Sequence, residues 1–126
     1  MKKAIATTAA PGAVGPYSQG IEANGLVFVS GQLPVDPATG AFAPGGVAEQ
    51  TAQSLKNISA VLAAAGCTMD DVVKTTVFLT DMGKFAEMNE VYATFFKGDC
   101  PARSAFQVGA LPKGAQVEIE AIAAKK

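Results

Sequence analysis

Arg103 is the side chain in this sequence best suited to binding an anionic group. It is the only arginine among ten basic residues, and it stands between Pro101-Ala102 and Ser104, where the pattern predicts that a loop gives way to a strand. Its guanidinium offers a rigid fork of donors that matches a carboxylate through two hydrogen bonds, which a lysine ammonium cannot do. We therefore interpret Arg103 as a carboxylate-binding residue, with a solvated surface position as the alternative.

Glu120 is the second candidate, as a base or as a residue that orients water. Strand alternation gives one face to four residues of the last segment, Glu118, Glu120, Ile122 and Ala124. Two glutamates on a solvated edge are the simpler interpretation. The apolar residues on the same face favour an interface instead, and a carboxylate beside an apolar surface has a pKa tuned by burial and can serve as a general base.

Four further residues are candidates for a binding site because of their positions on a predicted helix or at the ends of predicted loops. Asn89 lies on the apolar stripe of a predicted helix, four residues after Phe85, and its amide needs hydrogen-bond partners. We expect it to tie this helix to a neighbouring loop. Tyr17, Ser30 and Gly31 adjoin loop ends, where binding sites are commonly built. Gly31 would let a ligand approach the backbone closely, and turn geometry explains this glycine equally well.

The composition excludes several kinds of chemistry. No histidine is present, so Ser-His-Asp triads, Cys-His pairs and histidine-ligated zinc sites are ruled out. Cys67 and Cys100 are the only cysteines, too few for a disulfide framework or a thiolate cage. We expect two free thiols, no metal and no cofactor. The net charge of −1 lacks the basic stripe of nucleic-acid-binding proteins, so no nucleic-acid partner is expected.

The elements that must position these residues follow from the hydrophobic pattern. Asn24-Gly25 predicts a tight hairpin turn. Apolar residues at three- and four-residue steps predict a helix over 47–65 that ends at Gly66. Segment 72–80 is apolar on both alternating sets, which predicts a central strand covered on both faces. The other expected elements are a helix over 83–97 and strands over 2–6, 17–23, 26–30, 104–109 and 116–124.

This order predicts one α+β domain over residues 1–126, with two helices on one face of a five- or six-stranded sheet. Two helices cannot cover both faces, so the other face needs a partner, and a second copy of the chain is the simplest one. No stretch approaches the roughly 20 apolar residues of a membrane span, and the first residues lack the apolar region of a secretory signal. We expect a cytoplasmic protein without a membrane partner.

Six segments, in this order, resemble the Rid family of reactive intermediate imine deaminases, also called the YjgF or endoribonuclease L-PSP family. The resemblance extends over essentially the whole chain, and the segments are residues 15–20 (Gly-Pro-Tyr-Ser-Gln-Gly), 29–34 (Val-Ser-Gly-Gln-Leu-Pro), 64–66, 73–79, 101–104 (Pro-Ala-Arg-Ser) and 117–123 (Val-Glu-Ile-Glu-Ala-Ile-Ala). The resemblance implies a chorismate mutase-like fold, a homotrimer and active-site clefts between subunits. It also implies cofactor-free hydrolysis of 2-aminoacrylate, 2-aminocrotonate and related enamines or imines to 2-keto acids and ammonia.

Position by position, the resemblance implies that Arg103 holds the substrate carboxylate and that Glu120 orients or activates the attacking water. Backbone groups at Gly31 and Ala105 would contact the ligand. Three residues, Tyr17, Ser30 and Asn89, would line or brace the cleft. Many bacterial members carry a cysteine where this chain has Ala105, so any role of a thiol at that point is absent here, while a backbone contact is preserved.

Two other functions are open at this point. A non-catalytic protein that binds or senses 2-keto acids would use the same carboxylate fork. A ribonuclease or translation inhibitor, a label that some relatives carry, fits poorly, because metal-free RNA cleavage usually needs a histidine or comparable acid–base pair and cations near the phosphate. This chain has a single arginine, no histidine and a net negative charge.

Overall fold

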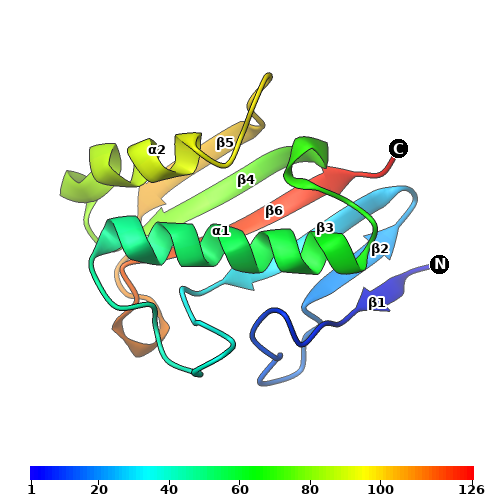
Figure 1. The fold of residues 1–126 in the computed structure, drawn as a ribbon, viewed down its shortest axis with the longest axis horizontal. Helices are drawn as coiled ribbons and strands as arrows, with labels where there is room; N and C mark the ends of the chain where they lie inside the picture. Colours follow the sequence, from blue (N-terminus) through cyan, green and yellow to red (C-terminus); the bar gives the residue numbers. More distant parts are fainter.

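The computed structural model describes residues 1–126 and has one six-stranded mixed sheet with the strand order β1-β2-β3-β6-β4-β5. Two helices cover one face of this sheet (Figure 1), as predicted. All neighbouring strands are antiparallel except the parallel pair β4 and β5. The elements are β1 (Lys3–Ile5), β2 (Gly20–Ala23), β3 (Leu26–Gln32), α1 (Val47–Ala64), β4 (Val72–Leu79), α2 (Phe85–Ala93), β5 (Ala102–Gln107) and β6 (Val117–Ala124).

Two of the predicted turns form for the expected reasons. Asn24 and Gly25 have φ angles of 51° and 76°, which gives the left-handed turn that joins β2 to β3. Gly66 has a φ angle of 80° and follows α1 directly after its C-cap. The N–H groups of Gly66 and Cys67 bond the carbonyls of Ala63 and Leu62, so the helix ends in a Schellman motif.

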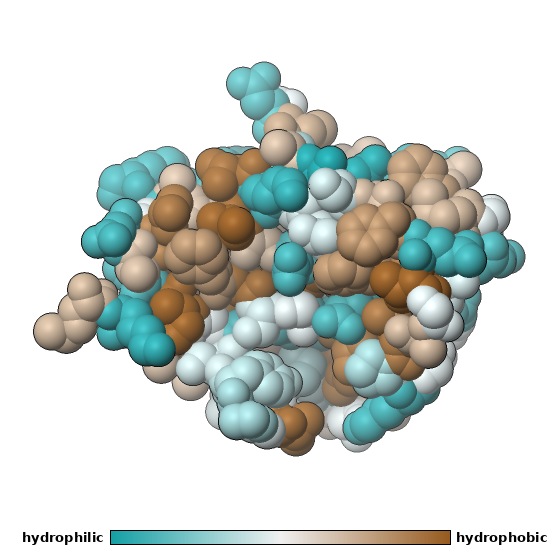
Figure 2. Space-filling model, turned by 180° about the vertical axis from the view of Figure 1, so that it is seen from behind, coloured by the Kyte–Doolittle hydropathy of each residue, from teal (hydrophilic) through white to brown (hydrophobic).

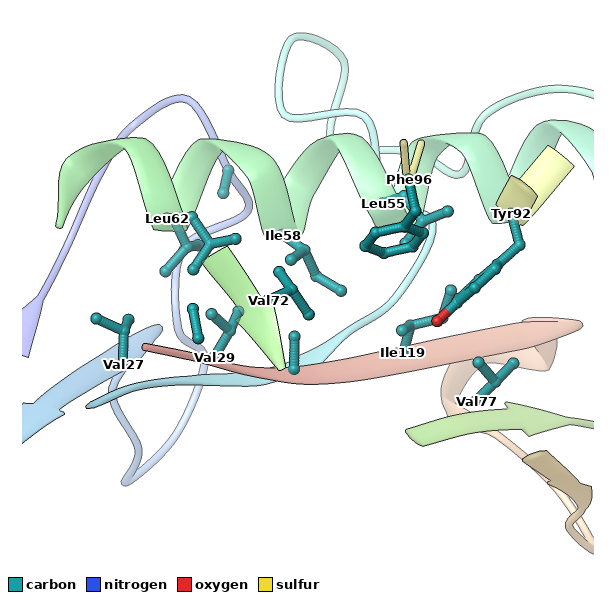
Figure 3. Packing of buried hydrophobic residues seen from close by; sticks show 14 of the residues in the cluster. Val27, Val29, Leu55, Ile58, Leu62, Val72, Val77, Tyr92, Phe96 and Ile119 are labelled. Atoms are coloured by element: carbon teal, nitrogen blue, oxygen red, sulfur yellow. The ribbon is translucent and has the colours of Figure 1, made fainter. Parts of the chain in front are cut away.

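The core lies between α1 and the covered face of the sheet. Figure 3 shows the apolar stripe of α1, with Leu55, Ile58 and Leu62 pointing down to the strands. These three side chains are completely buried, as are Val27 of β3 and Ile119 of β6. This contact is the one predicted from the three- and four-residue steps, and it fixes which face of β6 turns inward.

Three predictions about the second half of the chain need correction. The second helix is shorter than the predicted residues 83–97. Residues 82–84 form a 3₁₀ turn before α2. After Ala93 the backbone N–H groups of Thr94 and Phe95 donate to the carbonyls three residues earlier, so the chain leaves the α-helical pattern there. β5 begins at Ala102 rather than at residue 104, so Arg103 lies within the strand. β4 is not covered on both faces in one chain, because one face is buried (Thr75, Val77 and Leu79) and the other is only partly buried (Lys74, Thr76 and Phe78).

The face of the sheet opposite the helices is open in a single chain. Figure 2 views the molecule from this side and shows apolar groups interspersed with polar ones across it. Phe28 of β3 and Phe106 of β5, exposed by 41% and 45%, contribute to this surface. The uncovered face that the sequence predicted is therefore present. No helix of the structure is both long and apolar enough to cross a membrane.

Candidate functional site

Arg103 is held on the helix-covered side of the sheet by one stripe of α2. Its Nη1 donates a hydrogen bond of 2.7 Å to Oδ1 of Asn89. Its guanidinium carbon lies 4.9 Å from the ring centre of Tyr92 and 5.3 Å from that of Phe85. These three α2 residues are spaced so that they share one side of the helix, and the aromatic faces attract the cation. The other guanidinium N–H groups make no hydrogen bond within the chain and can bind a ligand carboxylate.

Asn89 does not bind a neighbouring loop, so that prediction is wrong. Its side-chain oxygen accepts from Arg103 on β5 instead. The reason is the position of β5, which lies beside α2 and brings the guanidinium under the helix stripe. Asn89 thus ties the helix to the residue predicted to bind the carboxylate.

Tyr92 is a residue of the candidate site that the sequence analysis did not single out. Its hydroxyl and the hydroxyl of Thr75 on β4 lie 2.7 Å apart in a buried hydrogen bond, and Thr75 is the strand partner of Arg103. Figure 3 shows Tyr92 reaching from α2 to the sheet. Burial raises the pKa of the Tyr92 hydroxyl, so this group stays neutral and keeps the ring fixed beside the guanidinium.

Arg103 and Glu120 lie on opposite faces of the same sheet. Arg103 is paired with Thr75, which is 1% exposed and belongs to the face beneath the helices. Glu120 is paired with Thr76, the next residue of β4. Because successive residues of a strand point to opposite faces, the two side chains cannot meet around one ligand within a single chain.

Glu120 stands at a depression on the open face with a volume of about 360 Å³. Its lining combines a few polar groups with apolar side chains of β2, β3 and β6: Ile21, Phe28, Val29, Ser30, Lys74, Thr76, Glu120, Ala121 and Ile122. A shallow, mostly apolar hollow with a carboxylate, a hydroxyl and an ammonium group is a suitable place for a small polar molecule.

A β-bulge at Ser30 and Gly31 lies opposite Glu120. The pairing of β3 with β6 runs from Val29–Ala121 to Gln32–Ile119, so two residues of β3 face one residue of β6. The Ser30 hydroxyl donates a 2.6 Å hydrogen bond to the carbonyl of Ser18, which joins the bulge to the N-terminal loop. The structure thus brings Ser30, Gly31 and Glu120 together.

Gly31 lets the carboxylate of Glu118 approach the backbone closely. A β-carbon at this position would overlap the Glu118 carboxylate, so any larger residue would displace that group. Glu118 is half-buried, and burial raises its carboxyl pKa, with a further rise from the nearby charge of Glu120. We name Ser30, Gly31, Glu118 and Glu120 the glutamate half-site. The sequence placed Glu118 on this face but gave no sign of its contact with Gly31.

Two predicted residues lie outside that half-site. Ala105 is two residues after Arg103 on the same face of β5. We name Asn89, Arg103 and Ala105 the arginine half-site. Tyr17 is half-exposed at a separate hollow of about 590 Å³ beside β1. The loop of Tyr17 is fixed by the buried side chain of Gln19, which accepts a hydrogen bond from the N–H of Thr7 and donates to the carbonyls of Thr7 and Pro11. Sequence reasoning missed this role of Gln19.

Both cysteines are free thiols, as predicted. Cys67 is buried, which raises the pKa of its thiol, whereas Cys100 is exposed. No group of three or more cysteine, aspartate and glutamate side chains gathers in the structure as metal ligands would.

Known proteins resemble this chain along nearly its whole length. A family model described as Endoribonuclease L-PSP matches residues 7–125. The 2-iminobutanoate/2-iminopropanoate deaminase of Mus musculus is 53% identical over 123 residues, which cover 98% of this chain and 91% of that protein. The crystal structure of E. coli TdcF with bound serine is 48% identical, with a TM-score of 0.94 over 98% of this chain and 99% of that chain. A Thermotoga maritima structure is 47% identical, with a TM-score of 0.96 over 100% and 99% of the two chains.

The match to the family model spans most of the chain, and relatives at about this identity share the whole fold. The segments that carried the resemblance in the sequence, from residue 15 to residue 123, all fall within the matched range. The chain therefore belongs to the endoribonuclease L-PSP family.

Proposed function

We propose that this chain is a 2-iminobutanoate/2-iminopropanoate deaminase, which hydrolyses enamines and imines such as 2-aminoacrylate to 2-keto acids and ammonia. Relatives with this name share about half of its residues over nearly the full length. The observation that carries the proposal is the arginine half-site, which presents a fixed guanidinium with free donors to a carboxylate-bearing molecule. TdcF, of the same fold, binds serine, a small molecule with a carboxylate and an amino group.

In this proposal the residues divide the work. Arg103 binds the substrate carboxylate through two hydrogen bonds and so orients the imine carbon. Glu120 accepts a proton from a water molecule that attacks this carbon. Backbone groups of Gly31 and Ala105 contact the ligand. Imines of 2-keto acids hydrolyse in water unaided, so orientation of the imine and of one water, with hydrogen bonds to the developing charge, is enough for catalysis.

The proposed enzyme is a homotrimer with its active sites between subunits. Arg103 and Glu120 are on opposite faces of one sheet, so a site that uses both takes each from a different subunit. The exposed apolar groups of the open face, among them Phe28 and Phe106, supply the surface that a second copy would cover. The free thiols of Cys67 and Cys100 fit a cytoplasmic location.

The deaminase proposal is tested by generating 2-aminoacrylate in situ with a pyridoxal-phosphate serine dehydratase and following the release of pyruvate. We expect this protein to shorten the lifetime of the imine in proportion to its concentration. A protein that only senses 2-keto acids would bind pyruvate and leave that lifetime unchanged, which would contradict the proposal. A preparation carrying Arg103→Lys serves as the control for contaminating activities.

The variants Arg103→Lys and Glu120→Gln separate binding from turnover. Lysine keeps the positive charge but cannot form the two parallel hydrogen bonds of the guanidinium. A charge-assisted hydrogen bond contributes about 1.5–3 kcal/mol, so its loss is expected to weaken 2-keto acid binding roughly 10- to 150-fold. Glutamine nearly keeps the shape of Glu120 but cannot accept the proton, so kcat falls more than affinity does. Calorimetric titration with pyruvate and the dehydratase-coupled assay measure the two effects. Equal losses of binding and kcat in both variants would refute this division of roles.

The trimer is tested by light scattering coupled to size-exclusion chromatography. We expect a mass near three times 12.8 kDa that is stable on modest dilution. Phe28→Glu places a charge on the open face and is expected to dissociate the oligomer, because an unpaired charge in an interface is costly. Lys56→Glu, on the exposed side of α1, adds a carboxylate without touching the open face and should leave the mass unchanged. A parent protein that is monomeric at micromolar concentration would contradict both the trimer and the proposal that its active site lies between subunits.

A further inference from the structure

Glu118 is a second carboxyl group of the glutamate half-site with surroundings unlike those of Glu120. Both side chains project from the open face of β6, two residues apart. Glu120 is exposed, whereas Glu118 is half-buried with its carboxylate packed on Gly31. No donor of the same chain makes a hydrogen bond or ion pair with the Glu118 carboxylate, although a carboxylate is normally an acceptor of such bonds.

The strand register explains this difference. Glu118 is paired with Phe78 of β4, whose ring meets that of Phe106 edge-to-face at 5.3 Å between centroids. Glu120 is paired with Thr76, and Lys74 follows at the next position of β4 on this face, beside Ile122. The ammonium group therefore lies toward Glu120, and the aromatic side chains lie toward Glu118.

The charged groups around Glu118 are few. From β4 the open face receives Lys74, and from β6 it receives Glu120. Beside the two glutamates β3 contributes Ser30 and Gly31, and β5 contributes Ser104 and Phe106, none of which is charged; Phe28 lies further along, beside Ile122. Burial first, and the negative charge of Glu120 second, raise the pKa of the Glu118 carboxyl, so it keeps its proton to higher pH than an exposed glutamate.

We propose that Glu118 is the general acid of this site and delivers a proton to the imine nitrogen while Glu120 takes one from water. The assignment rests on the proposed deaminase function. Two carboxyl groups in one site whose surroundings separate their protonation are the usual arrangement for an acid and a base acting together. The bulge at Ser30 and Gly31 faces both glutamates, and its Ser30 lines the hollow of about 360 Å³ together with Glu120.

The protons balance over one turnover. In the first step water forms a bond to the imine carbon and loses a proton to Glu120, while the C=N electron pair moves to nitrogen, which takes the proton of Glu118. In the second step the C–N bond breaks and its electrons go to nitrogen, which takes the proton from Glu120 and leaves as ammonia. The remaining hydroxyl gives its proton to Glu118 and becomes the carbonyl. Both side chains return to their starting states.

The test compares Glu118→Gln with the parent protein and with Glu90→Gln, a control that removes an exposed carboxylate of α2. Glutamine fills the same space against Gly31 but cannot transfer a proton. We expect kcat in the dehydratase-coupled assay to fall about 100-fold, with the affinity for pyruvate unchanged. The parent rate is expected to decline as pH rises through the pKa of Glu118, and this alkaline decline should be missing in Glu118→Gln and present in Glu90→Gln.

A second readout does not depend on activity. In protein labelled with carboxyl-¹³C glutamate, one NMR signal should titrate above the others in the parent and in Glu90→Gln, and it should be absent in Glu118→Gln. A signal that titrates with the exposed glutamates, or a Glu118→Gln variant with parental kcat and pH profile, would overturn the assignment while leaving the deaminase function intact. A parent protein without imine turnover would overturn both.

Discussion

The alternation of side chains along a β-strand determines on which face of the sheet Arg103 and Glu120 lie. Thr75 and Thr76 are neighbours on β4, and each is paired with one of the two principal residues of the proposed site: Thr75 with Arg103 and Thr76 with Glu120. The sheet therefore lies between a guanidinium and a carboxylate that a single ligand would need to touch together. In the proposed enzyme a second copy of the chain brings the other group to the ligand, and the face of the sheet that the two helices leave uncovered is available to that copy.

The two half-sites are built by different means. The arginine half-site is rigid because three side chains of one helix contact the guanidinium, and because the Tyr92–Thr75 hydrogen bond fixes one of these rings to the sheet. A fixed fork loses little conformational entropy when it binds a carboxylate. The glutamate half-site depends instead on an irregularity in the strand pairing, where the Ser30–Gly31 bulge lies opposite Glu120 and Gly31 leaves space for Glu118.

Much of this structure follows from local sequence patterns. The hairpin at Asn24-Gly25, the end of α1 at Gly66 and the shared face of Glu118 and Glu120 each depend on a few adjacent residues, and all three are confirmed. The choice of Arg103 came from its residue type, from its place at the predicted start of a strand and from the family resemblance. Its contacts with α2 could not be predicted, because they depend on β5 lying parallel to β4 and beside that helix, an arrangement set by residues far apart in the chain.

The features that sequence reasoning missed are of the same non-local kind. The β3 bulge depends on the register with β6, which begins some ninety positions later in the chain. The roles of Gln19 and Tyr92 depend on partners that only the folded chain supplies. Spacing on α2 did place Tyr92 on the stripe of Phe85 and Asn89, but an aromatic residue there is equally expected of a helix packed on a core.

Subunit complementation tests whether Arg103 and Glu120 act together from two different subunits. Arg103→Lys and Glu120→Gln chains, carrying two different affinity tags, are co-expressed and purified through both tags, so that every trimer contains both kinds of subunit. If each site takes its arginine from one subunit and its glutamate from the next, every mixed ring holds one site with both native residues, and activity returns to about one third of the parent value. The two variants mixed as separately formed trimers should show no such recovery. Mixed trimers that are no more active than either variant alone would contradict the account, because that result requires both residues to act from the same chain.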